Sequence, residues 1–283
     1  MTIKRVLLLM RSQPNPTPVD AIEAAVALAA KLDAKISTLS CAIRRHVPKG
    51  VLSGVVGVVP GLVGHEREEA VGEAQQLLDT FSDLARQRNV MGQAVHRQCF
   101  PEDVPNLLAG YARVNDLTIM PMLEGSYFDQ LASQWYLEAA LFNSGRPLLV
   151  LPHAFAPNAN GFGTAVVAWD QTKSAARALS DAIPMLRRAA SVRVVTITND
   201  KPILNEPPPH EVVLHLEAHG IKAAYEAIDA KGRGAAEVLD HSLRAGDLLV
   251  MGGYGHSRLR ETVFGGVTKH MLARLPVPVF MSH

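Results

Sequence analysis

The feature that most constrains the fold is an internal repeat, which divides the 283 residues into two halves. The segment Asp116-Leu117-Thr118-Ile119-Met120 is matched 131 positions later by Asp247-Leu248-Leu249-Val250-Met251. The same offset, without a gap, carries Pro147 onto Pro278, and each of these prolines opens a short apolar segment that ends its half. Repetition on this scale indicates that one folding unit occurs twice. We therefore expect two related domains, 1–152 and 163–283, separated by a linker rich in Pro, Asn and Gly.

Each half alternates short apolar segments with amphipathic ones. In the second half we expect strands near 191–198 and 221–228, followed by a helix near 234–245 that Gly246 ends. Alternating β and α elements with apolar strands favour a parallel sheet that helices cover on both faces. The sequence thus predicts an α/β fold with two doubly wound, five-stranded parallel-sheet domains, each with strand order 3-2-1-4-5.

Local signals predict where helices begin and where the two halves differ. Thr17 and Ser174 are expected to cap the first helix of each half, and Pro184 is expected to kink the second of these helices. The starts of the halves correspond at a larger offset, with Arg11 matched to Asp170, so the first half contains about 28 extra residues. We assign them to 43–66 and expect a mobile or partner-facing loop there.

Composition and charge argue against several functions. The chain has 28 basic and 27 acidic residues, so no bulk electrostatic attraction to nucleic acid or membrane is expected. No apolar run is long enough for a signal-peptide core or a membrane span, and we expect a cytoplasmic protein. Cys41 and Cys99 lack a metal-type spacing and are expected to be buried, and His215 with His219 has no evident third metal ligand.

The residues that carry chemistry follow the strand that ends near Met251. Gly252-Gly253-Tyr254-Gly255 lies where the chain turns from strand toward helix, and Gly265-Gly266 precedes another apolar helix. Glycine permits positive φ and lets a ligand approach the backbone. Successive N–H groups in such turns and at helix starts can bind anions, and the Thr268 hydroxyl can add a donor. The segment therefore predicts a phosphate cradle in two parts.

Asp170 supplies a carboxylate to the same expected crevice. It closes the first strand of the second half, whereas Gly252 opens the loop after the fourth strand. With strand order 3-2-1-4-5, these two strands flank the point where the order reverses, and ligands bind there in doubly wound sheets. A carboxylate in this place suits a ribose hydroxyl or an adenine amino group.

Together these residues resemble the universal stress protein family. Nucleotide-binding members carry Gly, two residues, Gly, nine residues, Gly, and then Ser or Thr. Here Gly252, Gly255 and Gly265 match, whereas Gly266 departs and removes a hydroxyl contact to phosphate. The resemblance implies that ATP or a related adenine nucleotide binds in the C-terminal domain, with or without Mg²⁺. It covers 164–283 by motif and 3–151 by architecture alone.

The expected binding residues combine the family pattern with His256 and Arg258, which stand in the glycine-rich segment and can reach phosphates. A loop histidine without a ligand and a solvated helix start are the alternatives for these two. The full set is Ala168, Trp169, Asp170, Ile197, Met251, Gly252, Gly255, His256, Arg258, Gly265, Gly266, Val267 and Thr268.

The first half departs from this pattern throughout. Arg11 stands in the place of Asp170, and the four glycines 252, 255, 265 and 266 are replaced by Pro121, Glu124, Gln134 and Trp135. We expect side chains to fill the cradle, and Glu124 to repel phosphate. The first half is therefore predicted to bind no nucleotide in the family manner.

Three functions remain open on the sequence. The first is a nucleotide-binding regulatory protein of the universal stress type, acting on an unidentified protein partner. The second is an enzyme of the related adenine-nucleotide α-hydrolase type, but no Ser-Gly-Gly-x-Asp-type loop is present, so at most slow ATP hydrolysis is expected. The third is an interaction scaffold without a ligand. The last strand of each half is apolar and is expected at a sheet edge, which invites pairing. The equivalent strands of the resembled family pair across a dimer, so the resemblance implies an intramolecular pseudo-dimer here, and a homodimer of whole chains is left open.

Overall fold

The computed structural model describes residues 2–12, 15–43, 60–122, 127–153, 155, 162–200, 208–253 and 266–283; for 60–71 and 127–131 it describes the backbone alone. Ten strands form one continuous sheet in the order β3-β2-β1-β4-β5-β10-β9-β6-β7-β8. The strands are β1 Arg5–Arg11, β2 Lys35–Ile43, β3 Met91–Cys99, β4 Leu117–Pro121, β5 Leu148–Leu151, β6 Thr164–Ala168, β7 Ser191–Thr198, β8 Ala223–Asp229, β9 Leu248–Gly252 and β10 Val279–Ser282. The helices are α1 Val19–Lys31, α2 Pro60–Gln87, α3 Val104–Arg113, α4 Tyr127–Phe142, α5 Lys173–Leu186, α6 Glu211–Ala218, α7 Ala235–Ser242 and α8 Gly266–Arg274, with a short 3-10 turn at Pro101–Asp103.

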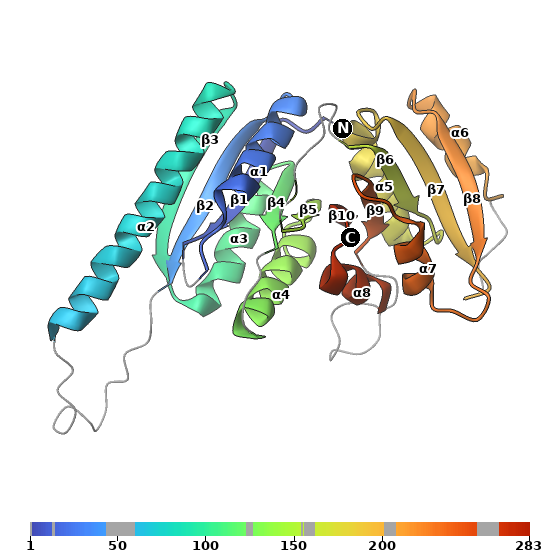
Figure 1. Ribbon diagram of the computed structural model, residues 1–283. Helices are drawn as coiled ribbons and strands as arrows, with labels where there is room; N and C mark the ends of the chain where they lie inside the picture. The colour runs from blue at the N-terminus through green and yellow to red at the C-terminus, as the bar shows by residue number, and fades with distance from the viewer. Residues whose placement is uncertain are drawn as a thin grey trace.

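The sheet consists of two five-stranded parallel halves that meet at their last strands. Counted within each half, the strand order is 3-2-1-4-5, as predicted. β5 and β10 pair antiparallel, with Val150 opposite Val279 and Leu148 opposite Met281. In Figure 1 these two strands lie where the halves meet, and β3 and β8 form the outer edges. The predicted intramolecular pseudo-dimer is therefore confirmed, and it takes the form of a single sheet.

The central strands are apolar because helices cover them on both faces. All five residues of β4 and all four of β5 and β10 are buried. The edge strands β3 and β8 are partly exposed and contain more polar residues. Burial along the chain thus follows the position of each strand in the sheet.

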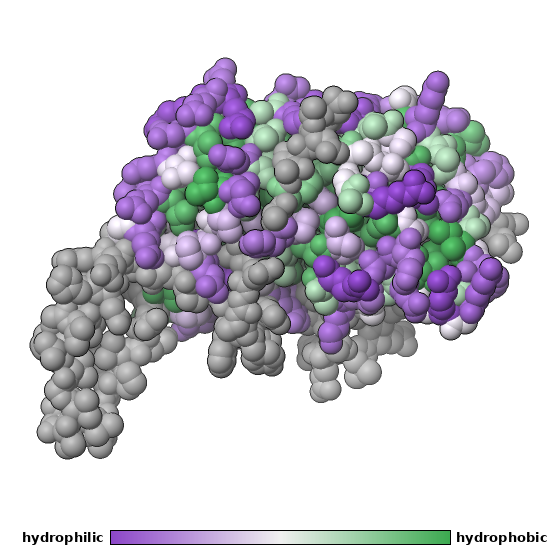
Figure 2. Space-filling model, viewed as in Figure 1, coloured by the Kyte–Doolittle hydropathy of each residue, from purple (hydrophilic) through white to green (hydrophobic). Residues whose placement is uncertain are grey.

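Two helix layers enclose two apolar clusters, one on each face of the sheet. The first, called the α1/α2/α5/α6 layer, includes Phe81, Leu179 and Leu216. The second, called the α3/α4/α7/α8 layer, includes Leu108 and Met271. Hydrophilic residues cover much of the described surface in Figure 2, and hydrophobic residues show between them in separate patches. Within the described ranges, no helix is both long and apolar enough to cross a membrane.

The predicted helix caps are wrong at both positions. The Thr17 hydroxyl accepts a hydrogen bond from the Arg11 backbone N at 2.9 Å, and α1 begins without a side-chain cap. The cap of α5 is Thr172, whose hydroxyl accepts from Ala175 N at 3.1 Å, two residues earlier than predicted. Pro184 lies in the last turn of α5, which ends at Leu186. The Thr17 hydroxyl is engaged by a backbone N–H outside the helix, so it does not cap α1. At α5 the Thr172 hydroxyl provides the cap that Ser174 was expected to provide.

The extra segment of the first half contains more helix than the sequence predicts. Residues 60–66 belong to the 28-residue helix α2, so the predicted loop 43–66 is wrong over this part, and 44–59 lie outside the described residues. In the second half, β7 spans 191–198 as predicted. α7 ends at Ser242, before the predicted 245. Asp247 follows, and its Oδ2 accepts from Arg244 N at 3.0 Å, which closes the turn into β9.

Candidate functional site

The candidate site lies at the carboxyl edge of the C-terminal half, between β6 and β9. These strands are adjacent and parallel, with Val167 opposite Val250. Asp170 follows β6 by two residues, and Gly252 is the last residue of β9. Because β7 lies on the other side of β6, this is the point where the strand order reverses. The structure thus brings Asp170 and Gly252 to the same edge of neighbouring strands.

Asp170 is exposed and its carboxylate is held by the start of α5. Its Oδ1 accepts from the Thr172 backbone N at 3.1 Å and from the Thr172 hydroxyl at 2.7 Å. Gln171 between them has a φ of 60°, in the left-handed region that such a tight turn requires. In the described part of the chain both hydrogen bonds of this carboxylate go to Oδ1. Oδ2 therefore remains available to a donor from a ligand.

An apolar rim lies beside this carboxylate. Ala168, Ile197 and Val267 are half-buried and pack against the α3/α4/α7/α8 layer. Ile228 on β8 joins them, because it pairs with Ile197 and is half-buried in the same cluster. Ile228 is not among the residues predicted from the sequence. Alternation along 223–229 gives the face of Ile228, but its pairing with Ile197 comes only from the strand register of the structure.

Three other predicted residues are placed differently. Met251 and Thr268 are buried, 5% and 3% exposed, so their side chains belong to the core rather than to an open wall. Trp169 packs its indole against the α1/α2/α5/α6 layer, on the opposite face of the sheet from Ala168. Its backbone O accepts from the Thr196 hydroxyl at 2.8 Å. Alternation explains this placement, since consecutive residues at the end of a strand face opposite sides.

The two glycines after β9 have packing reasons for lacking a side chain. A Cβ on Gly252 would lie 2.8 Å from Ala175 N and from the Ser174 carbonyl C and Cβ, because the start of α5 packs directly on the strand end. A Cβ on Gly253 would lie 2.6 Å from Leu141 Cδ2, which belongs to α4 of the other half. The sequence pattern alone favours space for a ligand as the reason for these glycines. The fold itself already requires Gly252, where a Cβ would meet backbone atoms, whereas at 253 it would meet only the end of the Leu141 side chain.

Gly266 is different, because a Cβ there would meet nothing within 4 Å. It is exposed and is the first residue of α8, whose first N–H groups have no acceptor within the helix. The structure therefore leaves room at 266 for the hydroxyl that the family pattern has and this chain lacks. Gly255, His256, Arg258 and Gly265 lie outside the described residues.

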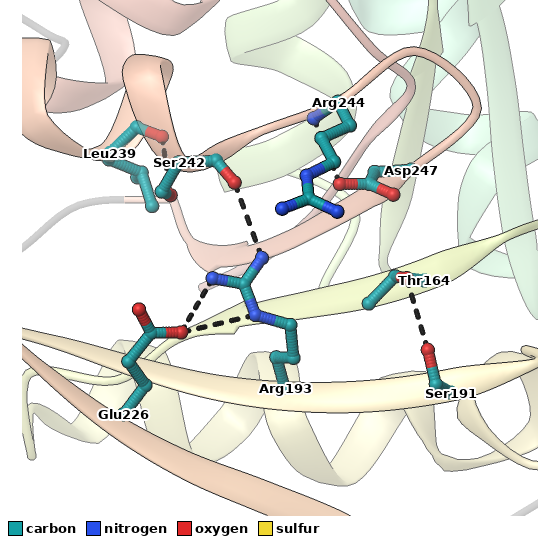
Figure 3. Close-up of polar contacts among 8 residues, drawn as sticks. All are labelled: Thr164, Ser191, Arg193, Glu226, Leu239, Ser242, Arg244 and Asp247. Atoms are coloured by element: carbon teal, nitrogen blue, oxygen red, sulfur yellow. Dashed lines mark hydrogen bonds and ion pairs between the residues drawn. The ribbon is translucent and has the colours of Figure 1, made fainter.

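An ion pair between β7 and β8 lies on the same face of the sheet as the rim. Arg193 donates from Nε and Nη2 to Glu226 Oε2, at 3.2 and 2.6 Å, and from Nη1 to Ser242 O at 3.3 Å. Figure 3 shows the guanidinium of Arg193 between the Glu226 carboxylate and the end of α7. Among the described residues, Ala168, Ile197 and Ile228 thus form an apolar rim with the Asp170 carboxylate at its end.

The first half has no equivalent arrangement in its described part. Gln134 and Trp135, which replace Gly265 and Gly266, lie within the helix α4 and are exposed. Pro121 is buried at the end of β4, where it has no backbone N–H to offer an anion. Glu124 lies outside the described residues.

Comparisons with known proteins agree on the fold. No protein-family model and no curated protein matches this sequence. Among solved structures, a universal stress protein from Archaeoglobus fulgidus DSM 4304 superposes with a TM-score of 0.70 at 16% identity, covering 98% of this chain and 95% of that one. A candidate universal stress protein from Pseudomonas aeruginosa UCBPP-PA14 has a TM-score of 0.52 at 15% identity, covering 99% and 93%. A protein of unknown function from Pseudomonas aeruginosa PAO1 gives the same score and identity, covering 99% and 92%. This chain therefore has the fold of the universal stress proteins, built twice in one polypeptide and joined through β5 and β10.

Proposed function

We propose that this chain is a regulatory protein of the universal stress type that binds ATP or a related adenine nucleotide at the carboxyl edge of its C-terminal half. One observation carries the proposal: an exposed carboxylate with an available oxygen, Asp170, stands at the switch point beside a half-buried apolar rim. Such a rim suits the flat face of a base, and such a carboxylate suits a ribose hydroxyl or an exocyclic amine.

The phosphates would extend from this rim toward the start of α8. Unpaired N–H groups of a first helical turn, together with the helix dipole, attract anions. Gly266 places no side chain in the way. In this proposal Met251 and Thr268 contribute backbone groups only, since their side chains are buried. The proposed output is a change in affinity for a regulatory protein partner.

Equilibrium binding of a fluorescent ATP analogue, with and without Mg²⁺, tests the proposal. Asp170→Ala is expected to weaken binding about 10- to 100-fold, because hydrogen bonds to a charged group contribute about 1.5–3 kcal/mol. Asp229→Ala is the matched control. Asp229 Oδ1 accepts from Lys231 N at 2.8 Å in a similar turn, but its side chain faces away from Ile228.

A gain of affinity gives a second, independent test. Gly266→Ser restores the hydroxyl of the family pattern in open space and is expected to tighten binding roughly 2- to 10-fold, the value of one neutral hydrogen bond. If the wild type binds no analogue at millimolar concentration, an interaction scaffold is the better description. Release of ADP or AMP during the assay would identify an enzyme instead.

A further inference from the structure

We propose that the end of α6 binds a divalent transition-metal ion, with Cu²⁺ preferred, through the imidazoles of His215 and His219. This site lies apart from the proposed nucleotide site. α6 belongs to the α1/α2/α5/α6 layer and packs against the edge strand β8 (Figure 1), whereas the apolar rim of the nucleotide site faces the other layer.

The two histidines lie one helical turn apart. Residues four apart share one face of a helix, and their side chains are neighbours. α6 ends at Ala218, and His219 follows it as the C-cap residue. His215 is exposed and His219 is half-buried, so the pair can be reached from solvent.

The distance between the two rings fits a shared metal ion. Their centres are 4.9 Å apart, with an angle of 65° between the ring planes. An imidazole nitrogen binds such an ion at about 2.0–2.1 Å, which places the ring centre about 3.2 Å from the ion. Two rings bound at an angle of about 90–110° would then have centres roughly 4.5–5.2 Å apart. Because the observed separation lies in this range, rotation of the side chains alone can turn both nitrogens toward one ion.

The ring nitrogens of this pair are not engaged elsewhere in the described part of the chain. Neither imidazole takes part in a hydrogen bond or an ion pair with a described residue, and the two rings contact each other. Other histidines of the same half do have partners. His241 Nδ1 lies 2.7 Å from Glu237 O, and His270 Nε2 lies 3.5 Å from Asp240 Oδ2. The α6 pair therefore keeps its nitrogens for a ligand, and imidazole suits Cu, Ni and Zn.

The backbone that carries His219 is held from two sides. His219 N and Ile221 N both donate to Leu216 O at 3.0 Å. Arg187 Nε donates to His219 O at 3.1 Å. Gly220 has a φ of 75°, which ends the helix. Since the backbone is fixed and the rings are already neighbours, little conformational freedom is lost when an ion binds.

The charges beside the pair are of both signs. Glu211 lies one turn before His215, and its Oε1 is 3.9 Å from His210 Nε2. The Arg187 guanidinium reaches the backbone of His219. With one negative and one positive group on either side, the imidazoles rather than a net charge would determine which ion binds.

The number of protein ligands favours one class of ion. Among the described residues, no three His, Cys, Asp or Glu side chains gather at a possible metal site. In this proposal water completes the coordination, whereas a structural zinc site needs four protein ligands. Cu²⁺ binds nitrogen ligands more tightly than Ni²⁺ or Zn²⁺ and accepts tetragonal sites of nitrogen and oxygen. The pair therefore favours Cu²⁺.

Isothermal titration of the full chain with CuCl₂, in the absence of nucleotide, tests the proposal. Wild-type protein is expected to bind Cu²⁺ more tightly than Ni²⁺ or Zn²⁺. His215→Gln and His219→Gln should each weaken Cu²⁺ binding at least about tenfold, because a site with two linked ligands becomes a site with one. His241→Gln is the control, since His241 is an exposed helical histidine of the same half whose ring is held by Glu237 O.

Two further measurements distinguish a shared ion from binding to single histidines. Electron paramagnetic resonance of the Cu²⁺ complex should show two coupled imidazole nitrogens in the wild type and one in either variant. Ni²⁺ should raise the melting temperature of the wild type but not of His219→Gln, because only the folded helix holds both rings at one ion.

The outcomes also separate this site from the nucleotide site. Asp170→Ala should leave Cu²⁺ binding unchanged, so failure of the nucleotide proposal would not affect this one. Absence of Cu²⁺ binding to the wild type at submillimolar concentration would overturn the inference. Loss in only one of the two α6 variants, or an equal loss in His241→Gln, would overturn it as well. Neither α6 histidine is buried, so circular dichroism of both variants should match the wild type.

Discussion

Gly252→Ala should destabilise the protein, although the change adds a single methyl group. The new Cβ would lie 2.8 Å from three atoms at the start of α5, namely Ala175 N and the Ser174 carbonyl C and Cβ. Two of these are backbone atoms of a packed helix, so α5 must shift away from β9 to relieve the overlap. Overpacking of this kind typically costs about 1–3 kcal/mol. For a chain of this size we expect the melting temperature to fall by roughly 2–10 °C.

Urea unfolding followed by circular dichroism measures the effect, with Gly266→Ala as the matched control. A Cβ at 266 meets nothing within 4 Å, and alanine is favoured over glycine in a helix by up to about 1 kcal/mol. The control should therefore be neutral or stabilising. If Gly252→Ala unfolds at the same urea concentration as the wild type, the close packing of α5 on β9 is not as described.

This prediction bears on the nucleotide site. The α5 start that would move is the same segment that holds Asp170 through Thr172. A bulky residue at 252 would lower nucleotide binding by displacing Asp170, even if Gly252 touched no ligand. Asp170→Ala and Gly266→Ser are the cleaner probes of the site for this reason.

Three further predictions concern buried groups and the contact between the halves. Burial, with Cys99 as neighbour, raises the pKa of the Cys41 thiol, so Cys41 should react slowly with a thiol reagent in native protein at pH 8 and quickly after unfolding. Rapid labelling of Cys41 in the native protein, identified by mass spectrometry, would contradict its burial. Asp181→Ala should cost about 1–3 kcal/mol in urea unfolding, because the buried Asp181 Oδ2 accepts from the Ser282 hydroxyl at 2.7 Å, and an unchanged midpoint would refute this role. Asp33→Ala removes an exposed ion pair of 3.0 Å with Arg188, which links the two halves, and should lower the free energy of unfolding by less than about 1 kcal/mol. A larger decrease would mean that this pair, rather than the pairing of β5 with β10, joins the halves.

The fold could be predicted from the sequence because its signals are long and repeated. The gapless offset from Asp116 to Asp247 fixes the fourth and fifth strands of both halves, and alternation of apolar and amphipathic segments fixes the layers. The pairing of β5 with β10 was implied by the family resemblance, and the apolar character of both strands and their last place in each half agree with it.

Local details that depend on three-dimensional neighbours could not be predicted in this way. The Thr17 hydroxyl bonds Arg11, six residues earlier, and no pattern within a helix indicates that choice. The packing reason for Gly252 could not be predicted, because the sequence does not show that α5 packs on this strand end. Helix 60–66 was missed because the segment before it, rich in Gly and Val, has no clear period.

The sequence predicted where the candidate site lies in the fold, but it did not predict every residue that lines it. Asp170, Ile197 and Val267 lie where the repeat and the strand order place them. Trp169 faces the other layer, and Ile228 enters through a strand pairing between segments 31 residues apart. Contacts between distant strands require the register, which composition and spacing do not provide.

The central claim is that the carboxylate of Asp170 and the apolar rim beside it form a seat for an adenine nucleotide. Equilibrium titration of a labelled ATP analogue against wild type, Asp170→Ala and Asp229→Ala measures this most directly. We expect saturable binding by the wild type and the Asp229 variant, and a loss of about 10-fold or more in affinity with Asp170→Ala. Equal affinity for all three proteins, or no binding by any of them, would contradict it.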